Sequence, residues 1–526
     1  MSRRTLLRHA VAAGIPVAAA ALPVDAAAKS ELQPVTLTLL HTNDLHSHVW
    51  HPDQPQGLVR LATLVREIRA EMPHVLLLDA GDIIHGSPEA KTFHGQAILH
   101  AMNTLKFVAA TVGNHEFDQG PGVLRQAMRQ VNFPMLSANV VETKTGKPFA
   151  DLKPWIVVTR GGARIGVFGL TTPTTVQIEW PRTLEGIAFT DPYVAARKAV
   201  TALRTESRVD AVIALSHLGY VDDQKLAAEV DGIDIIIGGH SHTTLAEQVW
   251  VNDVLIAQTG AYGRALGRID LTLQPARGGE PGKIIAINGN NGHWWGTNGV
   301  PSPLAKAFPT APLLKPTPET PEDAASLRAY KPWSDKLAPT LNETLTTALE
   351  PLPSIDATTQ ETALGNLFAD AIRAQAKTDI AFMAGSQIAP TGLPAGPVTV
   401  RDLYSVLGSY TRQHIVVARV PGQLLATVLQ TARSGDNAGR YPVHLSGMVV
   451  ETKGDIRIGD KPLDKEQHYT IASGAHVIQD YFYQKPGVEI LSDAVDAPTV
   501  RDAAIVYLRC HTPLRNELPN PLRWPQ

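Results

Sequence analysis

The feature of this sequence that most constrains its fold is a set of short apolar segments that each stop at a polar cluster. The first segment runs from Val35 to Leu40, and residues 41–46 then read His-Thr-Asn-Asp-Leu-His. A continuous apolar run of this length predicts a buried strand. Side chains two positions apart in an extended chain point to the same side, so Asp44 and His46 can face the same ligand.

Four more polar clusters stand at the ends of later apolar stretches. They read Gly81-Asp82, Gly113-Asn114-His115-Glu116-Phe117-Asp118, Ser216-His217 and Gly239-His240-Ser241-His242. Segments with helical periodicity, such as residues 58–69 and 193–205, lie between the predicted strands. Alternating strands and helices predict a layered α/β domain, and functional sites in such domains lie beyond the carboxyl ends of the strands.

The length of the chain, 526 residues, predicts two domains rather than one. The alternating pattern extends over residues 33–288, which we expect to form the first domain. Residues 289–339 are rich in Gly and Pro and predict a linker with a short helix, which begins at residues 320–323 and whose length Pro332 limits. Residues 340–526 predict a second, α+β domain, in which residues 361–375 have the pattern of an amphipathic helix.

Residues 1–28 predict a targeting segment and not a part of the fold. Residues 2–7 read Ser-Arg-Arg-Thr-Leu-Leu, which resembles a twin-arginine signal, and Ala26-Ala27-Ala28 offers a cleavage site. The apolar stretch between them, of about 15 residues, is short for a membrane span. We therefore expect export to the periplasm by the twin-arginine route, with no stable membrane insertion after signal removal. An uncleaved anchor helix is the alternative.

Composition and charge narrow the function classes. The formal net charge of −3 gives no electrostatic reason to expect a nucleic acid polymer as partner. Cys510 is the single cysteine, so an intrachain disulfide is impossible and a cysteine-based zinc site is excluded. A metal site must therefore use His, Asp, Glu or Asn, and the chain has 19 histidines.

The residues at the strand ends form a metal-ligating set: Asp44, His46, Asp82, Asn114, His115, His217, His240 and His242. Carboxylates, imidazoles and an amide oxygen suit divalent ions such as Mn²⁺, Zn²⁺, Co²⁺ or Fe²⁺. One ion rarely needs so many ligands, whereas two ions that share a bridging carboxylate do. The sequence therefore predicts a centre for two divalent metal ions.

The five clusters, in this order, resemble the signature of the calcineurin-like metallophosphoesterases. Their wording, together with a second domain behind them, resembles the bacterial 5′-nucleotidase/UDP-sugar hydrolase family. The resemblance implies a four-layer α/β/β/α metallophosphoesterase domain followed by a smaller α+β substrate-binding domain. It also implies the ligand roles: Asp44, His46 and His242 for the first metal, Asn114, His217 and His240 for the second, and Asp82 as the bridge.

The resemblance further implies a catalytic pair, in which His115 faces the phosphoryl oxygens and Asp118 orients it. Glu116 is expected to be structural, and His85 is a candidate for lining the phosphate site. The implied activity is hydrolysis of phosphate esters or anhydrides, most of all of nucleotides, by in-line attack of metal-bound hydroxide without a phosphoenzyme. The expected partner is a small phosphorylated molecule, and no partner protein is predicted.

The second domain departs from the family pattern where substrate binding is concerned. Gln360 and Ala389 occupy positions at which the family carries phosphate-binding arginines. Neither side chain can replace the bidentate fork of an arginine. Four residues are the candidates for stacking on a base or supplying a cation, namely Tyr410, Arg412, Tyr481 and Phe482. The alternative is that the aromatic rings only pack the second domain.

Two other functions remain open from the sequence. A thiosulfohydrolase-like enzyme would use the same metal core to cleave a sulfur ester. A non-catalytic secreted protein would bind metal or nucleotide only, although the presence of both His115 and Asp118 argues against it, because a structural site needs no catalytic pair.

Overall fold

The computed structural model describes residues 33–150, 152–247, 249–277, 280–288, 313–407, 414–434, 442–451, 454–494, 496–519 and 522–523. The predicted signal and most of the Gly- and Pro-rich part of the predicted linker lie outside these residues. Of the helices that are described, none has both the length and the apolar character that crossing a membrane requires.

The first sheet carries the first three polar clusters. Its strand order is β14-β13-β1-β2-β3-β4, with β15 also paired to β13. Strands β1 to β4 run parallel, whereas β13 is antiparallel to β1. The carboxyl ends of β1, β2 and β3 therefore meet at one edge. The bounds are β1 Val35–Thr42, β2 Val75–Asp79, β3 Ala109–Thr111, β4 Met135–Leu136, β13 Leu266–Gln274, β14 Lys283–Asn288 and β15 Leu313–Leu314.

The second sheet carries the other two clusters. Its order is β11-β12-β10-β9-β7-β6, and β7, β9, β10 and β12 are parallel. The clusters at residues 216–217 and 239–242 follow from the ends of neighbouring strands β9 and β10. The bounds are β6 Trp155–Arg160, β7 Ala163–Thr171, β9 Ala211–His217, β10 Ile235–Gly238, β11 Val249–Val251 and β12 Val254–Ala257.

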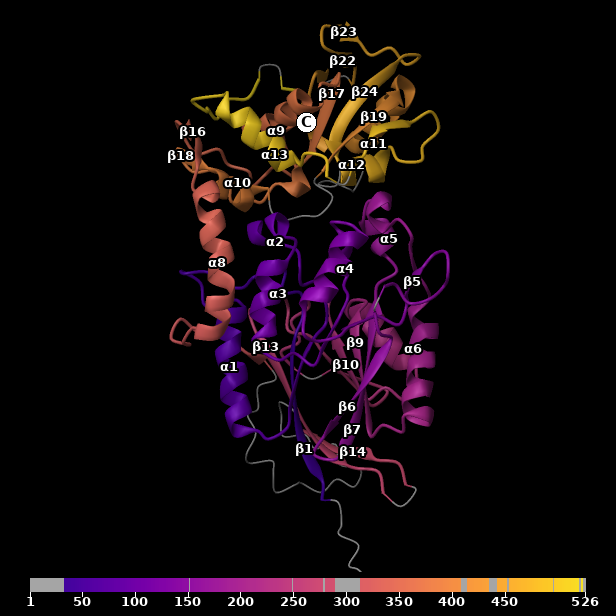
Figure 1. Ribbon diagram of the computed structural model, residues 1–526. Coiled ribbons are helices and arrows are strands. Elements are labelled where there is room, and N and C mark those ends of the chain that lie inside the picture. Colours follow the sequence, from indigo (N-terminus) through magenta and orange to yellow (C-terminus); the bar gives the residue numbers. More distant parts are fainter. Residues whose placement is uncertain are drawn as a thin grey trace, which may run out of the picture. The chain divides into compact units, whose positions relative to one another are not determined.

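The two sheets face each other and helices cover their outer sides (Figure 1). Leu39 of the first sheet and Ile213 of the second belong to one buried cluster between the sheets. Leu40 points the other way, into a cluster with helices α1 (Leu58–Glu71) and α3 (Gln96–Asn103). Helices α6 (Pro192–Thr201) and α7 (Tyr220–Glu229) cover the second sheet in the same manner. The predicted four-layer α/β/β/α arrangement is confirmed.

This layering explains why the strands read as continuous apolar runs and not as alternating ones. A parallel sheet with cover on both faces buries every side chain of its central strands. The last six residues of β1 are all buried, and so are all seven of β9. The same rule makes the strand ends the places where polar side chains first appear.

Helix α8 (Ala324–Leu341) differs from its prediction. It begins where expected, with the Asp323 side chain accepting the backbone N–H of Ser326. It then continues through Pro332 and Pro339 for 18 residues, so the prediction that Pro332 limits the helix is wrong. Packing outweighs the lost backbone hydrogen bond, because Tyr330 and Leu337 on either side of Pro332 are both buried.

The C-terminal region is built on a sheet of order β20-β17-β24-β19-β25. Helix α9 realises the predicted amphipathic helix, and the Thr362 side chain caps it by accepting the N–H of Gly365. The bounds are β17 Ile380–Ala384, β19 Ile415–Pro421, β20 Pro442–Ser446, β24 His468–Gly474, β25 Glu489–Ser492, α9 Ala363–Ala376, α10 Val400–Val406, α11 Gly422–Ser434, α12 Ala475–Tyr481 and α13 Val500–Arg509.

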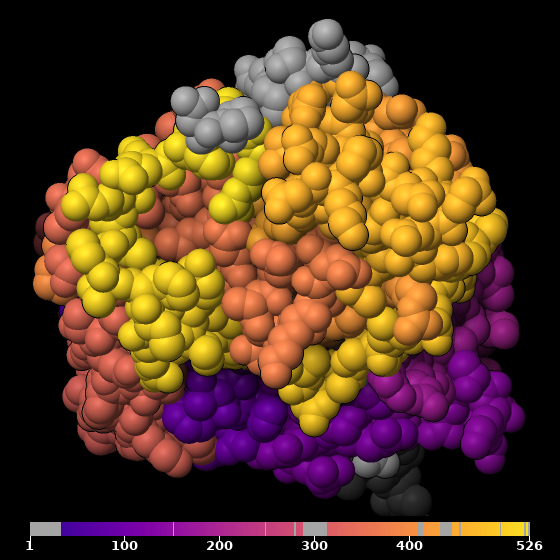
Figure 2. Space-filling view, turned by 90° about the horizontal axis from the view of Figure 1, so that it is seen from above, coloured from indigo at the N-terminus to yellow at the C-terminus, as the bar shows by residue number. Residues whose placement is uncertain are grey.

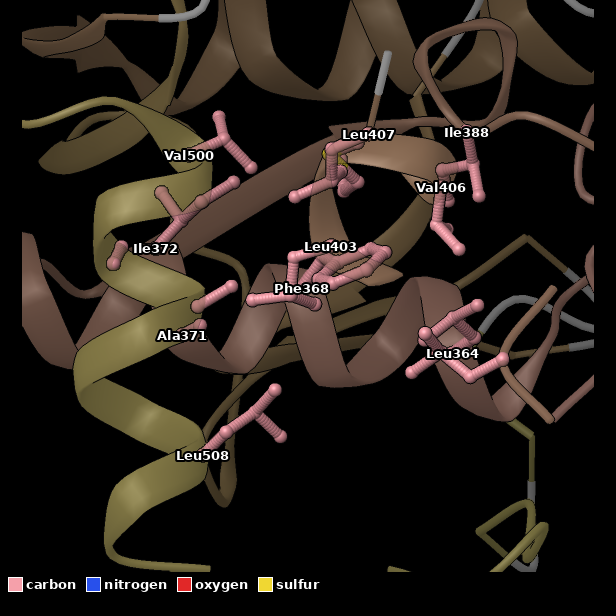
Figure 3. Packing of buried hydrophobic residues seen from close by; sticks show 14 of the residues in the cluster. Leu364, Phe368, Ala371, Ile372, Ile388, Leu403, Val406, Leu407, Val500 and Leu508 are labelled. Carbon is pink, nitrogen blue, oxygen red and sulfur yellow. The ribbon is translucent and has the colours of Figure 1, made fainter. Parts of the chain in front are cut away.

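Two apolar clusters sandwich this C-terminal sheet. On one side Phe368 of α9 packs with Leu403 of α10 and with Val500 and Leu508 of α13 (Figure 3). On the other side the strands pack against α11 and α12. The end of the chain, yellow in Figure 2, lies at the surface, where residues 509–513 are exposed. The region is an α+β unit, as predicted.

The remaining elements are short. They are α2 Pro88–Thr92, α4 Pro121–Gln130, α5 Thr175–Ile178, β5 Val140–Glu142, β8 Ile187–Phe189, β16 Thr344–Ala348, β18 Gly396–Thr399, β21 Met448–Val450, β22 Ile456–Ile458 and β23 Lys461–Pro462. Of these, α5 matters most for the site, because it delivers Glu179 to it.

Candidate active site

The predicted ligand residues from all five clusters come together beyond the strand ends. Potential ligand atoms within 4.8 Å of one another form a first group of Asp44, His46 and His242 and a second group of Asp82, His217 and His240. His46 also groups with His85 and His115, and His115 groups with Asp118 and Glu179. The clusters lie up to about 200 positions apart in the sequence. Only the topology of the two facing sheets brings them to one place.

The first group has the donor set of a transition-metal site. Nε2 of His46 lies 2.9 Å from Nε2 of His242, and the latter lies 3.4 Å from Oδ1 of Asp44. Two ring nitrogens this close need a shared proton or a cation between them, since their lone pairs otherwise repel. Imidazole and carboxylate donors suit divalent ions of the first transition row. The residues therefore fit a metal ion.

The second group fits a metal as well. Nδ1 of His217 lies 2.6 Å from the carbonyl oxygen of Ala80 and donates its proton there, which leaves the lone pair on Nε2. Nε2 makes no hydrogen bond, although it is fully buried and lies 3.1 Å from Oδ2 of Asp82. Holding one ring nitrogen by a backbone carbonyl is how proteins orient histidine ligands. His240 completes the group, with Nδ1 2.9 Å from Oδ1 of Asn114.

Asp82 lies between the two groups. Its Oδ2 is 3.1 Å from Nε2 of His217 and 3.9 Å from Nε2 of His46. One carboxylate therefore reaches both groups, as a bridging ligand must.

The electrostatics of the site follow from buried carboxylates. Burial raises the pKa of Asp82, but His217 and His115 outweigh it and hold the pKa well below its usual range. Burial lowers the pKa of His217, yet Asp82 outweighs it and raises the pKa to about 10. Burial, followed by His217, lowers the pKa of His240 to about 4. A buried anion that draws protons onto its neighbours also attracts divalent cations.

The backbone at the ligand residues is strained. Five of them have positive φ, which side chains other than Gly rarely adopt, and the angles are 49° at Asp44, 45° at His46, 59° at Asp82, 70° at His240 and 53° at His242. Each such residue costs roughly 1–3 kcal/mol, and such residues concentrate at functional sites. The strain is held by hydrogen bonds between loops, because the Asp44 and His46 N–H groups donate to the carbonyls of Gly81 and Asp82, each at 2.9 Å.

Glu116 holds two of these loops in place. It is buried, and its carboxylate accepts backbone N–H groups from Asp82 (3.0 Å), Ile83 (2.6 Å), Ile84 (3.2 Å) and Gly113 (2.6 Å). The loop after β2 and the loop after β3 are thereby tied to one side chain. Glu116 therefore has the structural place that the sequence predicts for it.

Gly113 is required by close packing at the same junction. A Cβ atom there would lie 2.1 Å from Oδ1 of Asp82, far inside van der Waals contact. The glycine before Asn114 thus lets the bridging carboxylate approach the neighbouring loop.

His115 and Asp118 form a pair beside the ligand groups. Nδ1 of His115 lies 3.2 Å from Oδ1 of Asp118, and Nε2 lies 3.9 Å from Oδ2 of Asp82. Burial lowers the pKa of His115, but Asp82, Asp118 and Glu179 together raise it well above its usual value. A charged imidazole in this place can donate a hydrogen bond to an anionic oxygen.

A cavity of about 560 Å³ opens onto His115 and onto the two histidines of the first ligand group. His46, His115 and His242 line it together with Tyr262, whose ring centroid lies 5.3 Å from that of His242. Ala389 and Arg401 line it as well. Among the described lining residues, Arg401 alone carries a permanent positive charge, and its guanidinium donates to Oδ1 of Asn342 at 3.1 and 3.3 Å.

The structure does not support every residue that the sequence predicts for substrate binding in the second domain. Tyr410 and Arg412 lie outside the described residues. Phe482 is fully buried, and its ring stacks on Phe382 with centroids 5.9 Å apart. The prediction that Phe482 can stack on a substrate is therefore corrected: the residue after α12 turns inward and fills the core beneath the sheet. Tyr481 is half-buried against the same cluster.

Two residues of the site, Glu179 and Tyr262, were not predicted from the sequence. Glu179 is buried, and its Oε1 lies 3.9 Å from Nδ1 of His115. It ends a short helix and belongs to no motif, so no pattern pointed to it. Tyr262 follows the loop after β12, and its backbone N–H donates to the carbonyl of Asp44 at 2.8 Å. Neither position has a signal that spacing or periodicity could have revealed.

Comparisons with known proteins identify the families to which both regions are similar. Residues 37–244 match the family described as calcineurin-like phosphoesterase, and residues 344–482 match the family described as 5′-nucleotidase, C-terminal domain. Protein UshA of Yersinia enterocolitica is 28% identical, with 96% of each chain covered. The crystal structure of a 5′-nucleotidase precursor from Thermus thermophilus shares 26% identity at a TM-score of 0.68, covering 93% of this chain and 99% of that one.

A further relative is much longer than this chain. The trifunctional nucleotide phosphoesterase protein YfkN of Bacillus subtilis is 30% identical over 84% of this chain, which spans about a third (32%) of that protein. Both family matches lie in this chain, one after the other. The chain therefore belongs to the 5′-nucleotidase family of calcineurin-like phosphoesterases, which are metal-dependent hydrolases of phosphoric esters.

Proposed function

We propose that this protein is a nucleotide phosphoesterase that uses two divalent metal ions. Asp44, His46 and His242 would hold one ion, Asn114, His217 and His240 would hold the other, and Asp82 would be shared between them. The observation that carries the proposal is the pair of ligand groups within reach of one carboxylate, with His115 3.9 Å from that carboxylate. A site for metal storage would need no such histidine.

The chain's own residues supply the rest of the chemistry. When bound, the two ions provide Lewis acidity and an activated water for an in-line displacement at phosphorus. His115, with Nδ1 held by Asp118, donates from Nε2 to an oxygen of the phosphoryl group or of the leaving group. Buried surroundings strengthen that hydrogen bond, because the local dielectric is low.

The substrate class follows from the relatives and from the cavity. The names of the Bacillus and Thermus relatives refer to nucleotides as substrates. In this chain Arg401 lines the cavity and takes the place of the absent family arginines as the cation for a phosphate. Tyr410, Arg412 and Tyr481 stay candidates for contacts to the base.

Metal identity and location belong to the same proposal. Mn²⁺ or Zn²⁺ suits the mixed imidazole and carboxylate set. The Arg3-Arg4 motif supports export to the periplasm by the twin-arginine route. Fusing residues 1–32 to a reporter that is active only after folded export would test the route, and replacing both arginines by lysine should abolish export.

The decisive experiment is phosphate release by the mature protein with Mn²⁺ added. The panel holds AMP, ATP, a 3′-nucleotide, a 2′,3′-cyclic nucleotide, UDP-glucose and bis(p-nitrophenyl) phosphate. We expect turnover of at least one nucleotide, and loss of more than about 100-fold in kcat for His115→Asn with metal content unchanged. Absence of turnover across the panel, with two ions bound per chain, would overturn the proposal in favour of a binding protein.

A further inference from the structure

A third residue joins the His115–Asp118 pair. His85 lies in the loop after β2, three positions beyond Asp82, with 16% of its side chain exposed. Its Nδ1 lies 2.7 Å from Oδ2 of Asp118. This contact is shorter than the 3.2 Å between His115 Nδ1 and Oδ1 of the same carboxylate.

The two imidazoles share one carboxylate and lie side by side. Their rings stack nearly parallel, with centroids 4.4 Å apart and planes 14° apart. Each oxygen of Asp118 therefore lies close to a different Nδ1, although only the contact from His115 has the geometry of a hydrogen bond. With one imidazole nitrogen against each oxygen, the carboxylate cannot rotate about its last bond without moving against a ring, so both imidazoles restrict the orientation of Asp118.

The loop that carries His85 is itself locked. The next residue, Gly86, has a φ of 110°, and a Cβ there would lie 2.4 Å from the carbonyl oxygen of His46. The Asp82, Ile83 and Ile84 N–H groups just before it all donate to Glu116. The His85 ring is thus placed by backbone on both sides and not by its own contacts alone.

We propose that His85 is a positioning residue for catalysis: it clamps the Asp118 carboxylate and stacks on His115, so that Nε2 of His115 faces the cavity in one orientation. This inference rests on the proposed phosphoesterase activity. Asp118 then contacts two imidazoles instead of one. His85, Asp118 and His115 together determine how Nε2 of His115 meets the substrate oxygen. Side chains that orient a catalytic group typically account for about 10- to 100-fold in activity.

The alternative role for His85, which also lines the cavity, is direct contact of its Nε2 with the substrate. Amide substitutions separate the two roles. Asn places an N–H near the position of Nδ1, and therefore preserves the contact with Asp118. Gln places its amide near the position of Nε2, and therefore preserves a contact to substrate but not the clamp.

The test compares kcat and KM for the nucleotide that the wild type hydrolyses fastest. We expect His85→Ala to lower kcat by about 10- to 100-fold with little change in KM, His85→Asn to recover most of the loss, and His85→Gln to recover little. The double variant His85→Ala/Asp118→Ala should be no slower than Asp118→Ala alone, because His85 acts through Asp118. His100→Ala, an exposed histidine on α3, serves as the matched control.

Three results would overturn the inference. These are an unchanged kcat in His85→Ala, additive losses in the double variant, and rescue by Gln but not by Asn. Metal analysis of each variant accompanies the kinetics, and a loss of activity that merely follows loss of metal also counts against the clamp. Failure of the proposed function looks different, because the wild type itself then releases no phosphate, and the inference falls with it.

Discussion

The metal-binding region and the C-terminal region of this protein place their functional side chains in different ways. In the first, every predicted ligand stands at the end of a parallel strand, so the fold itself carries it to the common edge. In the second, the candidate aromatics follow a helix, and one residue of rotation decides whether a ring faces a ligand or the core. Phe482 faces the core and Tyr481 lies only partly within it. Position along a strand is thus a stronger predictor of function than residue type after a helix.

The largest expected loss of activity comes from changing a proposed metal ligand at a strand end, Asp82. Asp82→Asn keeps the shape of the side chain but removes the charge that reaches both ligand groups. We expect kcat/KM to fall by more than about 100-fold and at least one metal ion to be lost, measured by phosphate release and elemental analysis. Asp335→Asn, at an exposed aspartate paired with Lys331, is the control. Full activity with both ions retained would show that the bridge is dispensable.

The next prediction concerns the buried ring. Phe482→Ala removes a fully buried side chain, and we expect the free energy of unfolding to fall by about 3–5 kcal/mol. KM for the preferred nucleotide should stay unchanged in the folded variant, because the ring does not reach the cavity. Urea denaturation and steady-state kinetics measure the two quantities, with Leu491→Ala, 40% exposed, as the control. A raised KM without loss of stability would reverse the contrast between the regions.

The smallest effect sharpens the comparison by asking whether the second region contributes to binding at all. Arg401→Ala removes the permanent cation from the cavity lining, and we expect KM to rise about tenfold with kcat little changed, which corresponds to one charge-assisted hydrogen bond. Arg401→Lys should lie in between, since Lys keeps the charge but loses the fork. Arg457→Ala, at an exposed arginine in the same region, is the control. Equal KM values for all variants would remove Arg401 from the substrate site.

The sequence predicted the strand ends because two rules act together there. The strands of a parallel sheet that is covered on both faces must be apolar. Functional polar residues in such folds gather beyond the carboxyl ends of the strands. The continuation of α8 through Pro332 could not be predicted from the sequence. The helix is stabilised by side chains such as Tyr330, which packs against residues that are distant in the sequence. The burial of Phe482 and the approach of Glu179 to His115 depend on distant segments in the same way. Rules based on local sequence therefore fail at positions whose conformation is determined by tertiary contacts.

Glu116 has a consequence for how this protein can change over time. Within four adjacent positions, Gly113 admits the Asp82 carboxylate, Asn114 faces His240, His115 faces the cavity and Glu116 ties two loops together. Three of the four meet at Asp82, because Gly113 leaves room for its Oδ1, the His115 N–H donates to that oxygen at 3.0 Å and Glu116 accepts the Asp82 N–H at 3.0 Å. A single conservative substitution nevertheless leaves the other three residues in their positions. A change in length is another matter, because inserting or deleting one residue moves all four out of step at once. The four positions therefore tolerate insertion and deletion even less than substitution, and a deletion scan through them should abolish metal binding and solubility together.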